Sequence, residues 1–78
     1  MRKRSLSIMG HRTSVALEDA FWEALERLAA ADRRSLPALI GEVDALRLKS
    51  TPTPGLASAL RVYVLDRTRR NSAGGGEA

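Results

Sequence analysis

Cysteine is absent from the 78-residue chain, so neither a disulfide nor a thiolate metal site can hold the fold together. The only histidine is His11, which leaves no basis for a metal site or a catalytic group built on several imidazoles. The run Gly74-Gly75-Gly76 is not followed by a helix, so it is not a phosphate-binding loop. We therefore expect no enzyme, no cofactor and no metal.

Long apolar runs are also missing. No segment approaches the ~20 apolar residues that a membrane-spanning helix needs. The basic N-terminus also lacks the apolar stretch of a secretory signal. We therefore expect a cytoplasmic protein with no membrane partner. With Phe21, Trp22 and Tyr63 as the only aromatic residues, the core has to consist mainly of Leu, Val, Ile and Ala.

Charge is plentiful and unevenly distributed, with a net charge of +4. The segment 1–12 holds Arg2, Lys3, Arg4 and Arg12 and no acid, whereas the segment 13–32 holds five acids against a single arginine. A basic segment is the electrostatic footprint expected of a protein that binds a polyanion, although a solvated basic arm has the same composition. The charge pattern favours a nucleic acid as partner without identifying how it is recognised.

Residues 12–17 alternate between apolar and polar side chains, which predicts a half-buried strand. One face carries Thr13, Val15 and Leu17, and the other carries Arg12, Ser14 and Ala16. The first face requires cover from other parts of the protein. The second is free to meet solvent or a ligand.

Apolar residues at helical spacing predict three helices after this strand, at about residues 19–31, 35–47 and 55–69. Ser35 is a suitable N-cap for the second helix. We divide the chain into a basic N-terminal arm (residues 1–10), a domain (residues 11–68) and a disordered tail (residues 69–78). The predicted fold class is mostly α with one short strand.

A single half-buried strand leaves backbone N–H and C=O groups without partners. The strand either pairs with residues 3–8 as a hairpin or pairs with the same segment of a second chain. The turn Met9-Gly10 is not one of the preferred hairpin sequences, which argues against the first solution. A small domain gains core by dimerising, so we favour a homodimer that pools residues from both chains. These residues are Val15, Leu17, Phe21, Leu25, Leu39 and Ile40.

Three parts of the sequence resemble the ribbon-helix-helix superfamily: the stretch from His11 to Glu18, the Phe21-Trp22 pair with Leu25, and the segment from Ser35 to Ile40. More narrowly, the segments KRSLSIMGHRTS (residues 3–14) and LASALRVYVL (residues 56–65) are similar to a bacterial ribbon-helix-helix domain family with an HRTS-type strand. The resemblance covers about residues 3–66. It implies an intertwined homodimer with a two-stranded antiparallel ribbon, here followed by an extra C-terminal helix.

The resemblance also implies a site. In the superfamily the ribbon enters the major groove of DNA, and its outward residues contact bases. Here these residues are Arg12, Ser14 and Ala16, although a polar residue is more common at the position of Ala16. The N-terminus of the second helix contacts phosphate, which points to Ser35 and Leu36. Four nearby or N-terminal cations are further candidates for phosphate contacts: Arg33, Arg34, Arg4 and Lys3.

The function that follows is a sequence-specific, double-stranded DNA-binding protein, with transcription regulation as its role. A second interpretation is a dimeric interaction module of the same fold, of antitoxin or adaptor type, whose third helix binds a protein partner and which reads little DNA. A third is a monomeric adaptor built from a hairpin and helices. Salt dependence of duplex binding separates the first two, and solution mass identifies the third.

Overall fold

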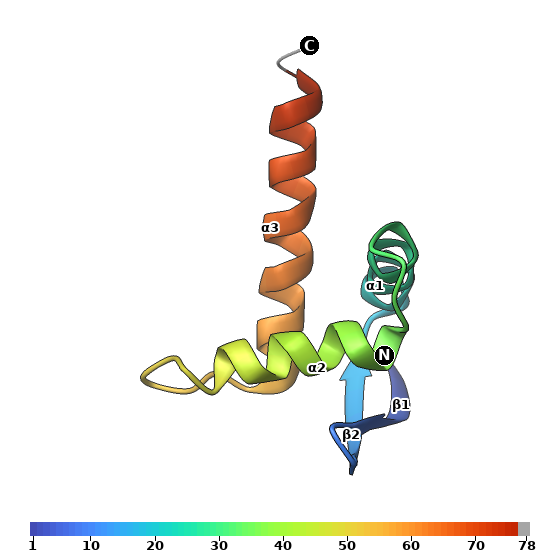
Figure 1. Ribbon diagram of the computed structural model, residues 1–78, viewed down its shortest axis with the longest axis vertical. Coiled ribbons are helices and arrows are strands. Elements are labelled where there is room, and N and C mark those ends of the chain that lie inside the picture. Colours follow the sequence, from blue (N-terminus) through green and yellow to red (C-terminus); the bar gives the residue numbers. More distant parts are fainter. Residues whose placement is uncertain (77–78) are drawn as a thin grey trace.

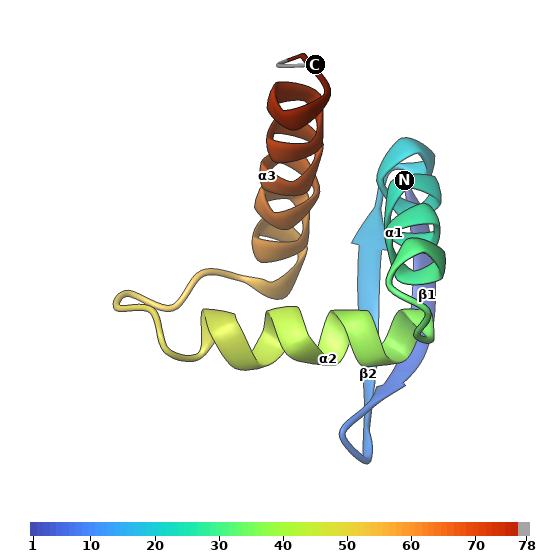
Figure 2. The same cartoon turned by 45° about the horizontal axis from the view of Figure 1, so that its top comes forward.

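The computed structural model describes the backbone of residues 1–76 and the side chains of residues 1–70. Within these residues the elements are β1 (Arg2–Ile8), β2 (His11–Leu17), α1 (Asp19–Ala31), α2 (Leu36–Arg47) and α3 (Leu56–Gly76). The strands form a two-stranded antiparallel sheet, and α3 rises crosswise from α2 away from the hairpin tip (Figures 1 and 2). None of the described helices combines the length and the apolar character that crossing a membrane requires.

Residues 12–17 form the predicted strand, but its partner is the N-terminal segment of the same chain. β1 and β2 pair from Arg2 opposite Leu17 to Ile8 opposite His11. The expectation of a single strand is therefore wrong, and residues 2–8 form a strand where we expected a basic arm. The sequence already contains part of the physical reason, because Leu6 and Ile8 alternate with polar residues. In the structure both side chains are buried, with 8% and 4% of their surface exposed.

The hairpin turn consists of Met9 and Gly10, with φ angles of 51° and 84°. Positive φ at both central residues is what a two-residue type I′ turn requires. Glycine adopts this conformation freely, whereas a methionine there costs roughly 1–2 kcal/mol. Burial of a large aliphatic side chain contributes about 1.5–3 kcal/mol. The free energy gained by burying Leu6 and Ile8 therefore exceeds the conformational cost of Met9 in the turn, which is why the hairpin forms.

A Met9→Asn substitution should stabilise the protein, because asparagine tolerates the left-handed conformation better than methionine. A gain of about 0.5 kcal/mol would raise the midpoint of thermal unfolding by roughly 2–4 °C for a chain of this size. Circular dichroism melts measure this shift. Met9→Ala is the matched control, since it removes the same side chain without gaining that tolerance. If both variants melt at the same temperature, the turn is not strained at this position.

The core is closed within one chain. Its buried residues come from all five elements: Leu6, Ile8, Val15, Leu17, Trp22, Leu25, Ala29, Leu39, Ile40, Val43, Leu60 and Val64. The residues that we expected two chains to bury jointly are already buried here, apart from the half-buried Phe21. β1 and α3 provide the cover that the sequence analysis assigned to a second protomer. The core therefore gives no reason of its own for a dimer.

The helix predictions are confirmed, with one difference in length. Ser35 caps α2, and its Oγ accepts a hydrogen bond from the N–H of Ala38 at 3.2 Å. α3 continues to Gly76 rather than ending near residue 69. Residues 69–76 are therefore helical in the structure, where we expected a disordered tail. Residues 77–78 of the predicted tail lie outside the described residues.

The helices cover one face of the hairpin. Leu6 and Ile8 of β1 and Val15 and Leu17 of β2 point into the core, where they meet apolar residues of all three described helices. α2 approaches β1 so closely that a Cβ on Gly41 would lie 3.4 Å from Cγ2 of Ile8. The opposite face of the hairpin is left bare by this arrangement.

Candidate nucleic-acid interface

The bare face of the hairpin, called here the outer face, is formed by alternate residues of both strands. The strand register places Lys3 opposite Ala16, Ser5 opposite Ser14, and Ser7 opposite Arg12. Five of the six side chains are exposed, and Ala16 is half-buried. None of the six is acidic. The three residues predicted to contact bases therefore share one exposed surface with three residues of β1.

The two cations of this face, Lys3 and Arg12, lie near its opposite ends, and serine hydroxyls occupy three of the other positions. The Oγ atoms of Ser5 and Ser14 lie 3.3 Å apart, at hydrogen-bonding distance, which links the two strands through their side chains. The guanidinium group of Arg12 can donate two parallel hydrogen bonds to guanine, whereas serine donates to or accepts from several bases. The outer face therefore presents mainly hydrogen-bond donors, which suit a polyanion with acceptor-rich edges.

The cations of β1 and β2 on the inner face form ion pairs with α1, whereas those on the outer face do not. Arg2 forms a 3.2 Å ion pair with Asp19. Arg4 forms a 3.1 Å ion pair with Glu26. The guanidinium of Arg4 also lies 4.9 Å from the ring centroid of Trp22, a cation–π distance. In contrast, Lys3 and Arg12 have no ion pair with any described residue. The acids of α1 thus neutralise the inward cations and leave the outer face positively charged.

The N-terminus of α2 offers less to an anion than the sequence predicted. The N–H of Ala38 is already bonded to Ser35, and Pro37 has no N–H. This leaves the N–H of Leu36 as the one donor of the first turn that lacks an acceptor among the described residues. Arg33 is exposed just before the helix. The structure therefore provides one amide and one adjacent cation at this helix end.

Arg34, a second candidate for phosphate contact, is engaged within the fold. It pairs with Glu42 and lies 3.5 Å from Asp32. The Glu42 carboxylate is the main reason that the pKa of Arg34 is raised. Arg4 is similarly engaged by α1. Contacts of Arg4 and Arg34 with phosphate remain predictions, and each would require an existing ion pair to open or to be shared.

Two arginines of α3 bind the two ends of α1. Arg61 pairs with the carboxylate of Glu18 at 3.0 Å, and Arg67 pairs with both carboxylate oxygens of Asp32 at 3.0 and 3.1 Å. These arginines lower the pKa of Glu18 and of Asp32 through their hydrogen bonds. Arg67 also donates to the hydroxyl of Tyr63 at 2.6 Å. These cations fix α3 in position, so they are not available to a ligand.

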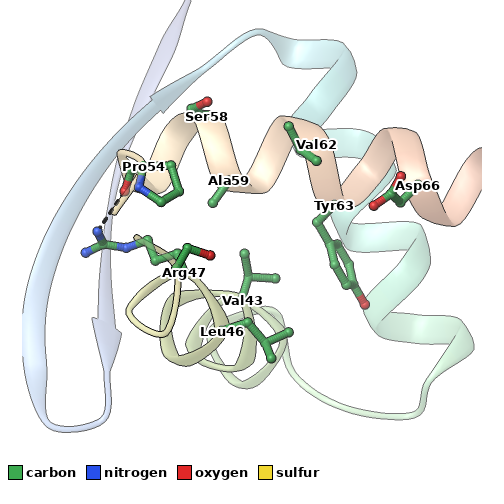
Figure 3. Close-up of a pocket in the computed structure, with 10 residues that line it drawn as sticks. Val43, Leu46, Arg47, Pro54, Ser58, Ala59, Val62, Tyr63 and Asp66 are labelled. Atoms are coloured by element: carbon green, nitrogen blue, oxygen red, sulfur yellow. Dashed lines mark hydrogen bonds between the residues drawn. The ribbon is translucent and has the colours of Figure 1, made fainter. Parts of the chain in front are cut away.

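A second surface feature is a groove of about 350 Å³ between α2 and α3 (Figure 3). Val43, Leu46, Ala59 and Val62 line it together with polar residues, and Leu46 and Val62 are 50% and 54% exposed. Arg47 closes one end through a 3.0 Å hydrogen bond to the carbonyl oxygen of Pro54 (Figure 3). The groove is therefore a mainly apolar surface shared by α2 and α3. The described residues contain no group of three His, Cys, Asp or Glu placed to hold a metal.

A β-ribbon followed by the two helices α1 and α2 is the element order of a ribbon-helix-helix domain. The chain belongs to the ribbon-helix-helix domain family, whose family model matches residues 1–68. The match includes β1 and most of α3, so both belong to the domain. Searches of curated proteins and of solved structures found no matching chain.

Sequence reasoning missed the contribution of β1 to the outer face. Ser5 and Ser7 were not singled out, and Lys3 was predicted to bind phosphate from a basic arm rather than from a strand. The signal was present, because Leu6 and Ile8 on one face imply that Ser5 and Ser7 lie on the other. We missed it because we expected residues 12–17 to pair with the same segment of a second chain rather than with residues 3–8.

Proposed function

We propose that the protein is a double-stranded DNA-binding transcription regulator of the bacterial cytoplasm, and that its outer face enters the major groove. The strongest support for this proposal is that the two faces of the hairpin differ in whether their cations are paired with acids. Among the described residues, Lys3 and Arg12 face outward without an acidic partner, while Arg2 and Arg4 are neutralised on the inner side. Membership of the ribbon-helix-helix family supports the same function.

Each residue of β2 on the outer face has a distinct role in this proposal. Arg12 binds O6 and N7 of guanine, Ser14 hydrogen-bonds to a base edge, and Ala16 contacts a thymine methyl group. A second set of residues binds phosphate and fixes the orientation of the protein. This set consists of Lys3, Arg33, Ser35 and Leu36, with Arg4 and Arg34 available if their ion pairs open.

We further propose a homodimer formed through the free edge of β2. The outer edge of β1 is partly covered by α1, and its Arg2 carbonyl accepts a 2.9 Å hydrogen bond from Nε1 of Trp22. β2 pairs only with β1 within the described chain, so its other edge has open donors and acceptors. An exposed strand edge is a template for pairing with another chain. Antiparallel pairing of two β2 strands about a twofold axis gives a sheet ordered β1-β2-β2-β1.

Duplex binding at several salt concentrations tests the DNA-binding function. A protein that neutralises several phosphates loses affinity steeply as salt rises, with a log–log slope of about −0.9 per phosphate. Duplexes selected from a random pool should bind more tightly than unrelated duplexes. Solution mass measured on the same sample should correspond to two chains. Failure to bind any duplex would remove this function, and a single-chain mass would remove the dimer alone.

The alternative function, an interaction module that reads little DNA, is favoured by one observation. The groove between α2 and α3 is lined by Leu46 on one helix and Val62 on the other, and about half of each side chain is exposed. A protein helix presenting apolar residues is the kind of partner that such a groove fits. If duplexes bind with equal affinity whatever their sequence, whereas a Val62→Asp variant loses a copurifying protein, this alternative replaces the first.

A further inference from the structure

We propose that β1 is a phosphate-binding strand, which flanks the bases that β2 contacts. Its outward side chains, Lys3, Ser5 and Ser7, are the residues that bind the DNA backbone. This inference rests on the proposed DNA-binding function and adds a division of labour between the two strands. It applies to β1 as a paired strand with fixed side-chain directions rather than as a flexible basic arm.

The first argument is the width of the sheet. Neighbouring strands lie about 4.8 Å apart, so the two outer strands of a β1-β2-β2-β1 sheet are separated by roughly 14 Å. The major groove of B-DNA is about 12 Å wide. The central β2 strands therefore face the base edges, while the two β1 strands lie over the phosphates that border the groove.

The second argument is the chemistry of the side chains on each strand. The outward residues of β1 are one ammonium and two hydroxyl groups, which are common donors to phosphate oxygens. The planar guanidinium of Arg12, which suits a base edge, is on β2. The arginines of β1, Arg2 and Arg4, both point inward and pair with α1. Donors without a fixed planar shape are thus on the flanking strand.

The third argument is the register of the hairpin. Ser7 is opposite Arg12, and Ser5 is opposite and within hydrogen-bonding distance of Ser14. When β2 contacts bases through Arg12 and Ser14, the paired residues of β1 are held at the same level along the strand axis, one strand further out. The pairing therefore fixes where β1 meets the DNA, and no rearrangement of the hairpin is needed.

The test compares Lys3→Ala and a Ser5→Ala/Ser7→Ala double variant with the wild-type chain. Fluorescence anisotropy is measured on a duplex selected from a random pool and on an unrelated duplex, over a series of salt concentrations. Lys49→Ala and Ser58→Ala are the matched controls, because both residues are exposed on parts of the fold remote from the outer face. Circular dichroism checks that every variant is folded.

Each β1 variant should weaken binding to the selected duplex and to the unrelated duplex by the same factor. We expect at least about fivefold for the serine pair, because two hydrogen bonds to phosphate are removed in each chain. Lys3→Ala should also reduce the salt slope by about 0.9 for each phosphate that is no longer neutralised, or roughly 2 in a dimer. The controls should bind as the wild type does.

Three outcomes would overturn the inference. Wild-type affinity in both β1 variants, together with weaker binding by Arg12→Ala, would place β1 outside the interface while leaving the DNA-binding function intact. A change in the ratio between the two duplexes for Lys3→Ala, which leaves the hydrogen bond between Ser5 and Ser14 in place, would mean that β1 contacts bases. Absence of duplex binding by the wild-type chain would remove the proposed function and this inference with it.

Discussion

Arg12→Ala is expected to weaken binding to a selected duplex far more than binding to an unrelated one. A bidentate pair between arginine and guanine contributes about 1–3 kcal/mol of discrimination, which corresponds to roughly 5- to 150-fold for each pair. The alanine variant also has one cation fewer, which weakens binding to any duplex by a smaller amount. The difference between the two effects isolates the interaction with the base, and anisotropy titrations of both duplexes measure it.

Arg27→Ala provides the matched control for this experiment. Arg27 is exposed on α1, on the side of the hairpin that the helices cover, and it has no ion pair with a described residue. Its substitution removes the same charge without touching the outer face. If Arg12→Ala and Arg27→Ala have equal effects, Arg12 is an ordinary surface cation. If Arg12→Ala weakens both duplexes equally, Arg12 positions the protein without contributing to sequence preference.

Leu60→Ala is expected to destabilise the protein by about 2–5 kcal/mol, because apolar burial is reduced and a cavity is left behind. Leu60 lies on α3, has no exposed surface and belongs to the same core as Leu17 and Leu25. Small domains have total stabilities of roughly 5–15 kcal/mol, so a change of this size leaves the variant marginally folded or unfolded. Urea unfolding followed by circular dichroism measures the change.

Val62→Ala, two residues further along α3, is the control. Val62 is 54% exposed, and surface substitutions away from special features change stability by about 0.5 kcal/mol or less. Similar stabilities for the two variants would show that α3 is an appendage rather than part of the core. The expected difference would confirm that α3 covers the core in place of a second chain.

Two parts of the fold were predicted correctly because their signals are local. The alternation from Arg12 to Leu17 specified a strand and the side chains on each of its faces. The start of α2 followed from Ser35, whose hydroxyl satisfies a backbone donor that the helix itself leaves free. Both features depend on residues within a few positions of one another, so the sequence alone contains the information.

The buried face of α1 was predicted only in part. The dimer core expected from the sequence included Phe21 and Leu25 of this helix, whereas the structure buries Trp22, Leu25 and Ala29. The reason is that β1 provides a carbonyl oxygen for the indole N–H of Trp22, together with the cation of Arg4 over its ring. A buried tryptophan needs such a partner for its N–H. Neither interaction can be inferred before the pairing of β1 is known.

The sequence by itself determined the strand at residues 12–17, the order and approximate starts of the three helices that follow it, and the alternation that exposes Arg12 and Ser14. These follow from side-chain periodicity and capping, which act over a few residues. Only the tertiary structure decided that β2 pairs with β1, that α3 closes the core and which cations of the hairpin lack an ion pair among the described residues. Those outcomes depend on free energies summed over distant contacts. The burial of Leu6 and Ile8 outweighs the cost of Met9 in its turn, and acids on α1 neutralise Arg2 and Arg4 while leaving Lys3 and Arg12 exposed.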